Sequence, residues 1–356
     1  MPELRIDPLS GLRTIVAGGR ATRPGGGFEV TPAAPLDPAT DPFLEGHEDR
    51  TPPEVWALRP DGGAPNTPGW LVRAVPNLYP ALDPTAEDDP HERGGASAGA
   101  ATAAAGDPLA HGRGDPELFA SRPAEGAHEV VVSTPRPARS LAELEPDELE
   151  TAMDAWRTRV RAHAGAAYTH VIVNEGREAG ASLAHSHAQL YALPFVPAAL
   201  ARERERFTAH AERTDGRDLL ADLLQAEVRR DERVFALDRE AVALCPFASR
   251  VPFQVQIVPR SPRARFEDDG PIVARLLREV LRRLAAVLGA TPPLNLWVRT
   301  APQGARWFCW RIDLLPKLTQ PAGLELGAGL HLNTVAPEAA AAMLREAEPV
   351  PPAPVG

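Results

Sequence analysis

Two histidines lie one residue apart, at His185 and His187, within the segment NEGREAGASLAHSHAQLYALP that starts at Asn174. If this stretch is a β-strand, residues i and i+2 point to the same face, and Gln189 joins both histidines there. A neutral imidazole whose other nitrogen holds the proton presents a lone pair that can attack phosphorus. The spacing therefore predicts a nucleophile beside an amide donor.

The residues before the histidines are suited to binding a phosphate. Gly176 and Gly180 permit close approach of the backbone, and Ser182 adds a hydroxyl donor. An H-x-H pair on its own is more often a surface pair or part of a metal site than a nucleophile. The glycines, Ser182 and the following Gln189 shift the interpretation toward phosphoryl chemistry.

Short apolar runs on both sides of this segment predict the elements that hold it. In the first half, strands at 127–135 and 168–176 flank a helix that begins at Ser140, where Glu143 completes a capping-box pattern. A long charged helix, roughly 198–228, leads into the second half. The order then repeats, with strands at 241–248 and 252–260, a helix at about 268–288, and strands at 293–300 and 307–318.

This repeated order indicates a duplication. We expect an α+β fold of two tandem modules, each an antiparallel sheet with packed helices. The first module spans 1–197 with a low-complexity insertion at 83–122, the second spans 198–345, and a proline-rich tail follows at 346–356. Arg311 and Asp313 fall in the second module where the histidines fall in the first, so we expect only the first module to be chemically active.

Composition excludes several classes of protein. The 356 residues carry a formal net charge of −10, so no global basic field favours nucleic acid. No run approaches the ~20 apolar residues of a membrane span, and the first residues lack the apolar core of a signal peptide. Cys245 and Cys309 are isolated, which fits a reducing compartment. We therefore expect a cytoplasmic protein without nucleic-acid or membrane partners.

The histidine segment and several other blocks resemble the galactose-1-phosphate uridylyltransferases of the histidine-triad superfamily. The other blocks include LRIDPLSGLRTIVAGGRATRP, DPFLEGHEDRTPPEV, RAVPNLYPAL, GAHEVVVSTP and GLELGAGLHLNTVAPE, in the family's order. The resemblance implies that His187 takes UMP from UDP-glucose as a covalent nucleotidyl-histidine. Galactose 1-phosphate would then accept the nucleotide, so the implied partners are a nucleotide sugar and a sugar 1-phosphate.

The family's functional residues map onto individual positions of this chain. His187 is expected to perform catalysis with Gln189 and Ser182, which would contact the transferring phosphoryl oxygens. The resemblance implies six substrate-binding residues: Arg20, Arg23, Asn77, Asn174, Gly180 and Glu325. It also implies a homodimer in which the two arginines and Glu325 act across the interface.

Relatives with a structural zinc carry C-P-F-C where this chain reads D-P-F-L at 41–44. Asp41 can supply an oxygen ligand, Leu44 cannot ligate, and His128 and His185 stand at the remaining positions. Because structural zinc sites use four ligands, the sequence offers only a weak, incomplete zinc site. The alternative is a hydrogen-bonded cluster in which Asp41 accepts from His128 or His185. No organic cofactor is expected.

Two other functions remain open at this point. The same histidine would serve a phosphorylase or hydrolase that acts on ADP-glucose or a dinucleoside polyphosphate. The third hypothesis is a nucleotide-binding protein without catalytic activity, but a protein that only binds nucleotides would not need a nucleophile. The spacing of the motif does not separate uracil from adenine.

Overall fold

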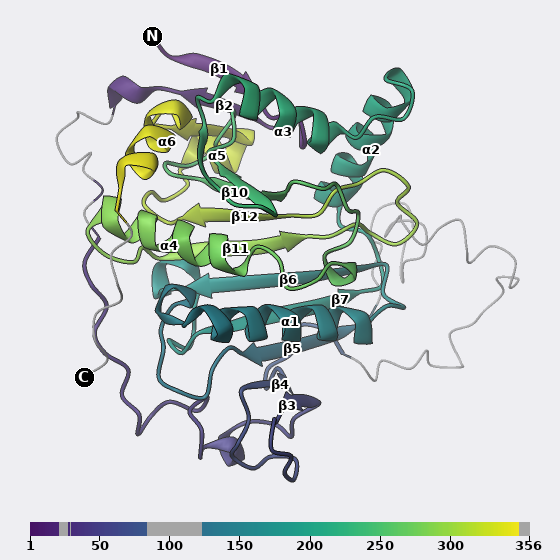
Figure 1. Ribbon diagram of the computed structural model, residues 1–356, viewed down its shortest axis with the longest axis vertical. Coiled ribbons are helices and arrows are strands. Elements are labelled where there is room, and N and C mark those ends of the chain that lie inside the picture. Colours follow the sequence, from purple (N-terminus) through teal and green to yellow (C-terminus); the bar gives the residue numbers. More distant parts are fainter. Residues whose placement is uncertain (21–27, 29, 84–122, 349–356) are drawn as a thin grey trace, which may run out of the picture.

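The computed structural model describes residues 1–20, 28, 30–83 and 123–348 and contains two β-sheets with helices around them (Figure 1). The strands are β1 (Glu3–Ile6), β2 (Arg13–Val16), β3 (Trp56–Leu58), β4 (Val72–Pro76), β5 (Ala127–Val132), β6 (Tyr168–Glu175), β7 (His187–Leu193), β8 (Val234–Leu237), β9 (Ala241–Leu244), β10 (Val255–Pro259), β11 (Leu294–Arg299), β12 (Arg311–Pro316) and β13 (Leu330–Asn333). The helices are α1 (Pro146–Ala162), α2 (Ala198–Arg213), α3 (Leu219–Arg230), α4 (Ala274–Leu288), α5 (Gly323–Ala328) and α6 (Pro337–Glu346).

Ten strands form one antiparallel sheet in the order β3-β4-β5-β7-β6-β11-β12-β10-β9-β8. The two halves of this sheet are arranged alike. One half consists of β5-β7-β6 with α1, and the other half consists of β10-β12-β11 with α4. They join where β6 pairs with β11, with Asn174 opposite Asn295. The predicted α+β class, with antiparallel sheet and packed helices in each half, is confirmed.

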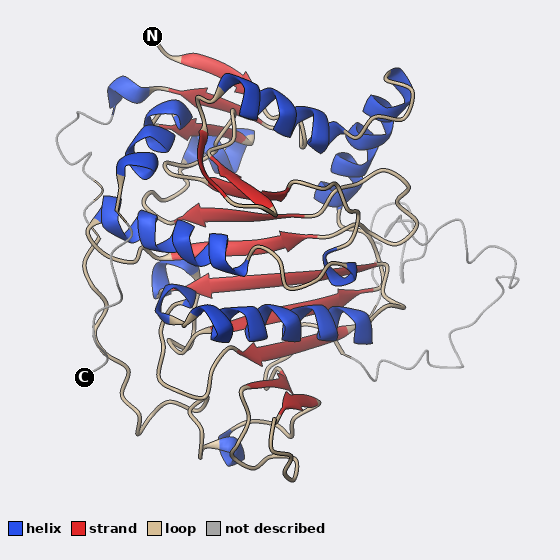
Figure 2. Ribbon diagram, viewed as in Figure 1, coloured by secondary structure: helices blue, strands red, loops and turns tan. Residues whose placement is uncertain are grey.

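Alternation along the strands gives the sheet two different faces. One face is apolar and packs against α1 and α4, where Val173 and Leu296 contribute to the same buried cluster as Trp156 and Leu284. Figure 2 shows these two helices lying along the same face of the sheet. The opposite face carries polar side chains, because residues two apart on a strand point the same way. His187, Gln189, Arg311 and Asp313 therefore lie on a face that α1 and α4 do not cover, whereas Glu129 of β5 faces α1 and pairs with Arg159 and His163.

A smaller sheet joins the two ends of the chain. Strand β2 pairs with β1 in antiparallel fashion and with β13 in parallel fashion. The segment after β12 thereby returns to the N-terminal strands, with α5 leading directly into β13. Among the described helices, none is long and apolar enough to cross a membrane.

Three predicted helices differ from those observed, and one of them, predicted from about residue 268, begins only at Ala274. The first does not begin at Ser140: this serine caps a short 3-10 turn at Leu141–Glu143, and α1 begins at Pro146. Proline disfavours helical geometry in the residue before it, and Glu145 is indeed extended, with ψ 159°. The predicted helix at 198–228 is broken into α2 and α3. Asp215 and Gly216, both with positive φ, end the first of them. Of the predicted insertion, only residue 83 lies within the described part, and the tail from 349 onward lies outside it.

Glu175, the last residue of β6, should make stability depend on pH. Its buried carboxylate accepts hydrogen bonds from Ser140 Oγ (2.6 Å) and Leu141 N (2.7 Å), but burial outweighs them and raises its pKa from 4.5 to about 7. A carboxyl whose folded pKa is raised stays protonated after the unfolded chain ionises, so its contribution to stability is lost as pH rises from about 4.5 through 7. Glu175→Gln should remove about 3 kcal/mol of that pH-dependent loss, measured as the free energy of unfolding in urea between pH 5 and 8.

The exposed Glu178 in the next turn provides the control, because Glu178→Gln should keep the wild-type slope. A Glu175→Gln protein with an unchanged slope would contradict the assignment.

Candidate active site

His187 begins β7 and is held in one tautomer by the backbone. Its Nδ1 lies 2.7 Å from the carbonyl oxygen of His185, and a carbonyl only accepts, so Nδ1 carries the proton. The Nε2 lone pair is therefore available. The side chain is only 5% exposed, and burial lowers the pKa of this imidazole below 6.5. His187 is thus neutral at pH 7 with a nucleophilic nitrogen.

His185 has a different environment, although it was expected to share one pocket with His187. Its Nδ1 lies 2.7 Å from Asp41 Oδ2, and its Nε2 lies 2.9 Å from the carbonyl oxygen of Thr134. Both nitrogens face acceptors, so the hydrogen bonding is complete only in the imidazolium form, which the Asp41 carboxylate balances. Burial opposes ionisation of Asp41, yet the hydrogen bond and charge of His185 lower its pKa. The Phe43 ring contacts both imidazoles edge-on, with centroids 5.2 Å from His187 and 6.2 Å from His185.

Gln189 lies two residues after His187 on the same face of β7 and is fixed by two donors. His128 Nδ1 accepts from Ala81 N (3.2 Å), so its Nε2 carries the proton and donates to Gln189 Oε1 (3.0 Å). The Tyr191 hydroxyl donates to the same oxygen at 2.9 Å. With Oε1 accepting from two donors, the amide NH₂ group of Gln189 is left to donate elsewhere. The His128 and Tyr191 rings are also stacked, with centroids 4.1 Å apart.

The turn between β6 and β7 needs glycine at two positions. Gly176 has φ 83°, and a Cβ there would lie 2.8 Å from Pro293. Gly180 has φ 89° and faces open space. Asn174 accepts from Asn295 Nδ2 at 2.8 Å, and the same amide donates to the Ala179 carbonyl, which anchors the turn to β11. Because Val173 pairs with Ala188, Asn174 and His187 lie next to one another on neighbouring strands.

The structure brings together some of the predicted substrate residues and not others. Asn77 follows β4, and its side-chain nitrogen lies 3.2 Å from His128 Nε2, close to Gln189. Ser182 is exposed in the loop before β7, without a hydrogen bond to His187 or Gln189 in the described structure. Arg23 lies outside the described residues. Arg20 ends a 3-10 turn, and its side chain is likewise outside what the structure describes.

Glu325 is separated from His187 within one chain. It lies in α5, beside the small sheet, several strands away from β7 (Figure 1). Its carboxylate accepts from Ala322 N at 2.9 Å, and this hydrogen bond lowers its pKa. Its role in holding a sugar stays a prediction.

The three predicted zinc ligands do not come together. Asp41 and His185 form a pair, but His128 is directed toward Gln189 on the neighbouring strand. In the part of the chain that is described, no group of three or more His, Cys, Asp or Glu side chains could hold a metal. The ring nitrogens of both histidines are already engaged in hydrogen bonds, so these residues do not fit a zinc ion.

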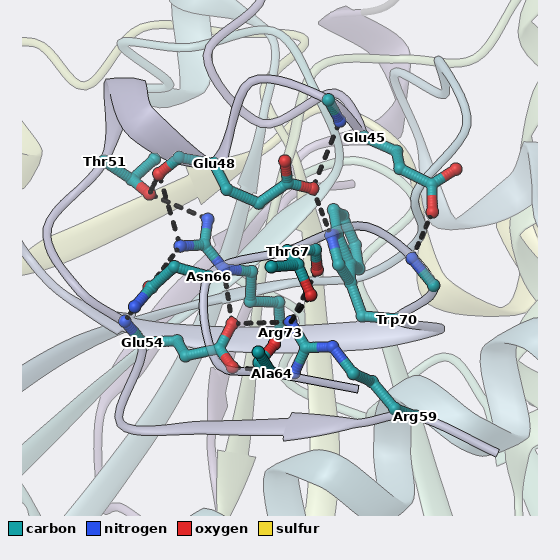
Figure 3. Close-up of polar contacts among 12 residues, drawn as sticks. Glu45, Glu48, Thr51, Glu54, Arg59, Ala64, Asn66, Thr67, Trp70 and Arg73 are labelled. Atoms are coloured by element: carbon teal, nitrogen blue, oxygen red, sulfur yellow. Dashed lines mark hydrogen bonds and ion pairs between the residues drawn. The ribbon is translucent and has the colours of Figure 1, made fainter. Parts of the chain in front are cut away.

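The segment that carries Asp41 and Phe43 leads into a buried ion-pair network that the sequence did not reveal (Figure 3). The Glu54 carboxylate binds Arg59 (2.7 Å) and Arg73 (2.9 Å). Glu48 accepts from Trp70 Nε1 at 2.7 Å and from Gly46 N at 3.1 Å. The network ties the irregular chain before β3 to β4, whose end leads to Asn77.

Comparisons with known proteins show which families this chain is similar to. Residues 76–197 match the N-terminal domain of galactose-1-phosphate uridyl transferase, and residues 140–347 match a domain of unknown function, DUF4921. ADP-glucose phosphorylase of Arabidopsis thaliana is 29% identical over 97% of this chain and 93% of the relative. A probable galactose-1-phosphate uridylyltransferase of Drosophila melanogaster is 24% identical over 98% and 95% of the two chains.

Solved structures show the same fold. The crystal structure of the Arabidopsis thaliana ADP-glucose phosphorylase with bound ADP-glucose has a TM-score of 0.76 at 25% identity, covering 98% of this chain and 100% of that one. A uridylyltransferase structure has a TM-score of 0.69 at 24% identity, covering 97% of both chains, and supports the fold alone. Fold and site together define an enzyme that transfers nucleotidyl groups. The chain belongs to the family of the DUF4921 domain, which matches residues 140–347, and its residues 76–197 are similar to the N-terminal domain of galactose-1-phosphate uridyl transferase.

No role for Tyr191 was predicted from the sequence, although this residue follows His187 and Gln189 at the same two-residue spacing. Tyr191→Phe should lower kcat/KM for nucleotide-sugar turnover about 3- to 10-fold, because one neutral hydrogen bond that fixes Gln189 is lost. In a Gln189→Ala background the same change should have little effect. Tyr79→Phe is the matched control, since Tyr79 is 85% exposed. An equal loss in both backgrounds would show that Tyr191 does not act through Gln189.

Proposed function

We propose that this enzyme moves a nucleoside monophosphate from a nucleoside-diphosphate sugar to a phosphate-bearing acceptor through a covalent intermediate on His187. The observation that best supports this proposal is the Nδ1–H···O=C hydrogen bond from His187 to His185, which leaves Nε2 as a buried, neutral nucleophile. In the first step, Nε2 bonds to the α-phosphorus while the bond from that phosphorus to the bridging oxygen breaks, and the sugar 1-phosphate leaves. In the second step, an acceptor phosphate oxygen attacks the same phosphorus, and the P–N bond breaks.

The surrounding donors are suited to stabilising the charge that develops in both steps. Gln189 can offer its NH₂ group to a phosphoryl oxygen, because His128 and Tyr191 hold its Oε1. The turn at Gly176 and Gly180 follows Asn174, which lies beside His187 on the neighbouring strand. Donors that are fixed before the reaction stabilise a transition state more than donors that must reorganise.

For the donor and acceptor, ADP-glucose and inorganic phosphate are our first choice. The match to an ADP-glucose phosphorylase over nearly the full length of both chains supports this pairing. UDP-glucose with galactose 1-phosphate is the second choice, supported by uridylyltransferase relatives such as one from Cryptococcus neoformans that is 26% identical over 84% of this chain. Both pairings use the same first step at His187.

We also propose that the enzyme acts as a homodimer. Glu325 lies far from His187 within one chain, so it would contact a sugar at His187 only from a second copy. Arg20 and Arg23 are proposed to bind phosphates from the same interface.

His187→Asn should abolish the covalent intermediate and lower kcat/KM at least 10⁴-fold, because no other group at the site offers an equivalent nitrogen. Mass spectrometry after incubation with ADP-glucose or UDP-glucose should find a nucleotidylated peptide containing His187 in the wild type only. His210→Asn, in a surface ion pair with Asp222, is the matched control. Label exchange between glucose 1-phosphate and the nucleotide sugar that survives in His187→Asn would overturn the mechanism.

An acceptor panel then separates the two pairings. The enzyme is charged with each nucleotide sugar and offered phosphate or galactose 1-phosphate. Release of ADP with phosphate supports the first choice, and formation of UDP-galactose supports the second.

We propose that the Asp41–His185 ion pair stabilises this part of the fold in place of the structural zinc of some relatives. Prolonged dialysis against EDTA should therefore leave the melting temperature and activity unchanged. Asp41→Asn should lower stability by about 3 kcal/mol, because it removes the charged acceptor that a buried ring nitrogen of His185 contacts. The control Asp37→Asn changes an exposed carboxylate. One equivalent of zinc per chain by elemental analysis would contradict the proposal.

A further inference from the structure

A polar cavity lies on the same sheet face as His187, in the other half of the sheet. It has a volume of about 180 Å³, and its lining includes Arg202, Arg250, Arg299, Arg311, Glu203 and Asp313. None of the residues of the His187 site line it. Strand β12, which carries Arg311 and Asp313, occupies the place in its half that β7 occupies in the other.

The carboxylates around this cavity already have donors. Asp313 accepts from Gln256 (2.8 Å), Trp297 Nε1 (3.0 Å) and Arg311 (3.2 Å). Glu203 accepts from Arg311 Nη2 at 3.1 Å. Asp7, which also lines the cavity, accepts from Leu9 N, Ser10 N and Ser10 Oγ. The acceptors are therefore engaged.

The donors, in contrast, are in excess. Arg311 is 3% exposed, and its Nη1 is buried with no hydrogen-bond partner. Arg299 Nε also lacks a hydrogen bond, although it lies 3.6 Å from Glu203 and 3.7 Å from Asp313. Within the described chain, neither Arg250 nor Arg202 pairs with a carboxylate. The Arg250 and Arg299 guanidinium groups both lie against the Trp297 ring, 5.6 Å and 5.4 Å from its centroid, which holds them in place. Each guanidinium has five N–H donors and no acceptor, so a ligand here must be acceptor-rich and negatively charged.

We propose that this cavity is a binding site for a small tetrahedral oxyanion of the inorganic phosphate class, separate from the His187 site. Four arginines and three carboxylates (Asp7, Glu203 and Asp313) line the cavity, and the one positive charge in excess favours an anion. The volume holds several times the ~30 Å³ of one water molecule. It is smaller than the ~300–1,000 Å³ of pockets that take drug-sized ligands, which excludes a nucleotide sugar.

Equilibrium dialysis of the full chain with radiolabelled inorganic phosphate tests the site. Arg250 is the residue to change, because it carries no ion pair whose loss would unfold the protein. Arg250→Gln should lower the number of bound phosphates by one per chain, or weaken that site at least 10-fold. Arg250→Lys should bind with intermediate affinity. Arg260→Gln, at an exposed position after β10, should bind as the wild type does.

Phosphate that binds at the His187 site remains in Arg250→Gln, so the two sites can be told apart. A crystal soaked in tungstate should show the anion within hydrogen-bond distance of Arg250 and Arg311. An Arg250→Gln protein with wild-type stoichiometry and affinity would overturn the proposal, as would a cavity that holds only water at saturating phosphate. An enzyme that lacks phosphorolysis yet keeps Arg250-dependent binding would contradict the proposed acceptor and not this site.

Discussion

The chemistry that we propose for this protein depends on one hydrogen bond, from His187 Nδ1 to the carbonyl of His185. It selects the tautomer whose Nε2 can attack phosphorus. The accepting carbonyl is itself fixed, because the His185 ring is held between Asp41 and the Thr134 carbonyl. The segment around Asp41 is anchored in turn by Phe43, which contacts both imidazoles, and by the ion pairs of Glu54 and Arg73 further along. A chain of rigid contacts therefore runs from an irregular loop to the nucleophile.

The two faces of the sheet have different roles: one stabilises the fold, and the other carries the polar side chains of the candidate site. The face against α1 and α4 buries apolar side chains and supplies most of the driving force for folding. The other face can then carry polar groups at residues two apart, such as His187, Gln189 and Tyr191. The same division holds in the second half, where Gln256, Arg311 and Asp313 occupy that polar face.

The parts of this structure that depend on local pattern were predictable from the sequence. Strand alternation and the repeated element order predicted the α+β class, and the glycines predicted the turn before β7. The start of α1 was misjudged because a serine–glutamate spacing also suits a 3-10 turn, and Pro146 decides where the helix begins. The hydrogen bond of His128 to Gln189 could not be predicted from the sequence. It depends on the register between β5 and β7, and the two residues are 61 positions apart in the chain. The position of Tyr191 in the site could have been predicted, because its spacing from His187 places it on the same face of β7.

The buried charges of the second half pose a different physical question. A buried ion pair is a weak source of stability, since desolvation offsets most of its attraction, and apolar side chains of similar size often serve as well. Arg311 and Asp313 nevertheless occupy the sheet face where apolar residues would fit, and Glu203 of α2 pairs with Arg311 there. The charged set fixes an orientation that an apolar set would not: Glu203 and Asp313 hold the Arg311 guanidinium, and its Nη1 is left without a hydrogen-bond partner. The first half uses the same arrangement, in which acceptors of fixed position orient a polar side chain and leave one reactive or donating edge free.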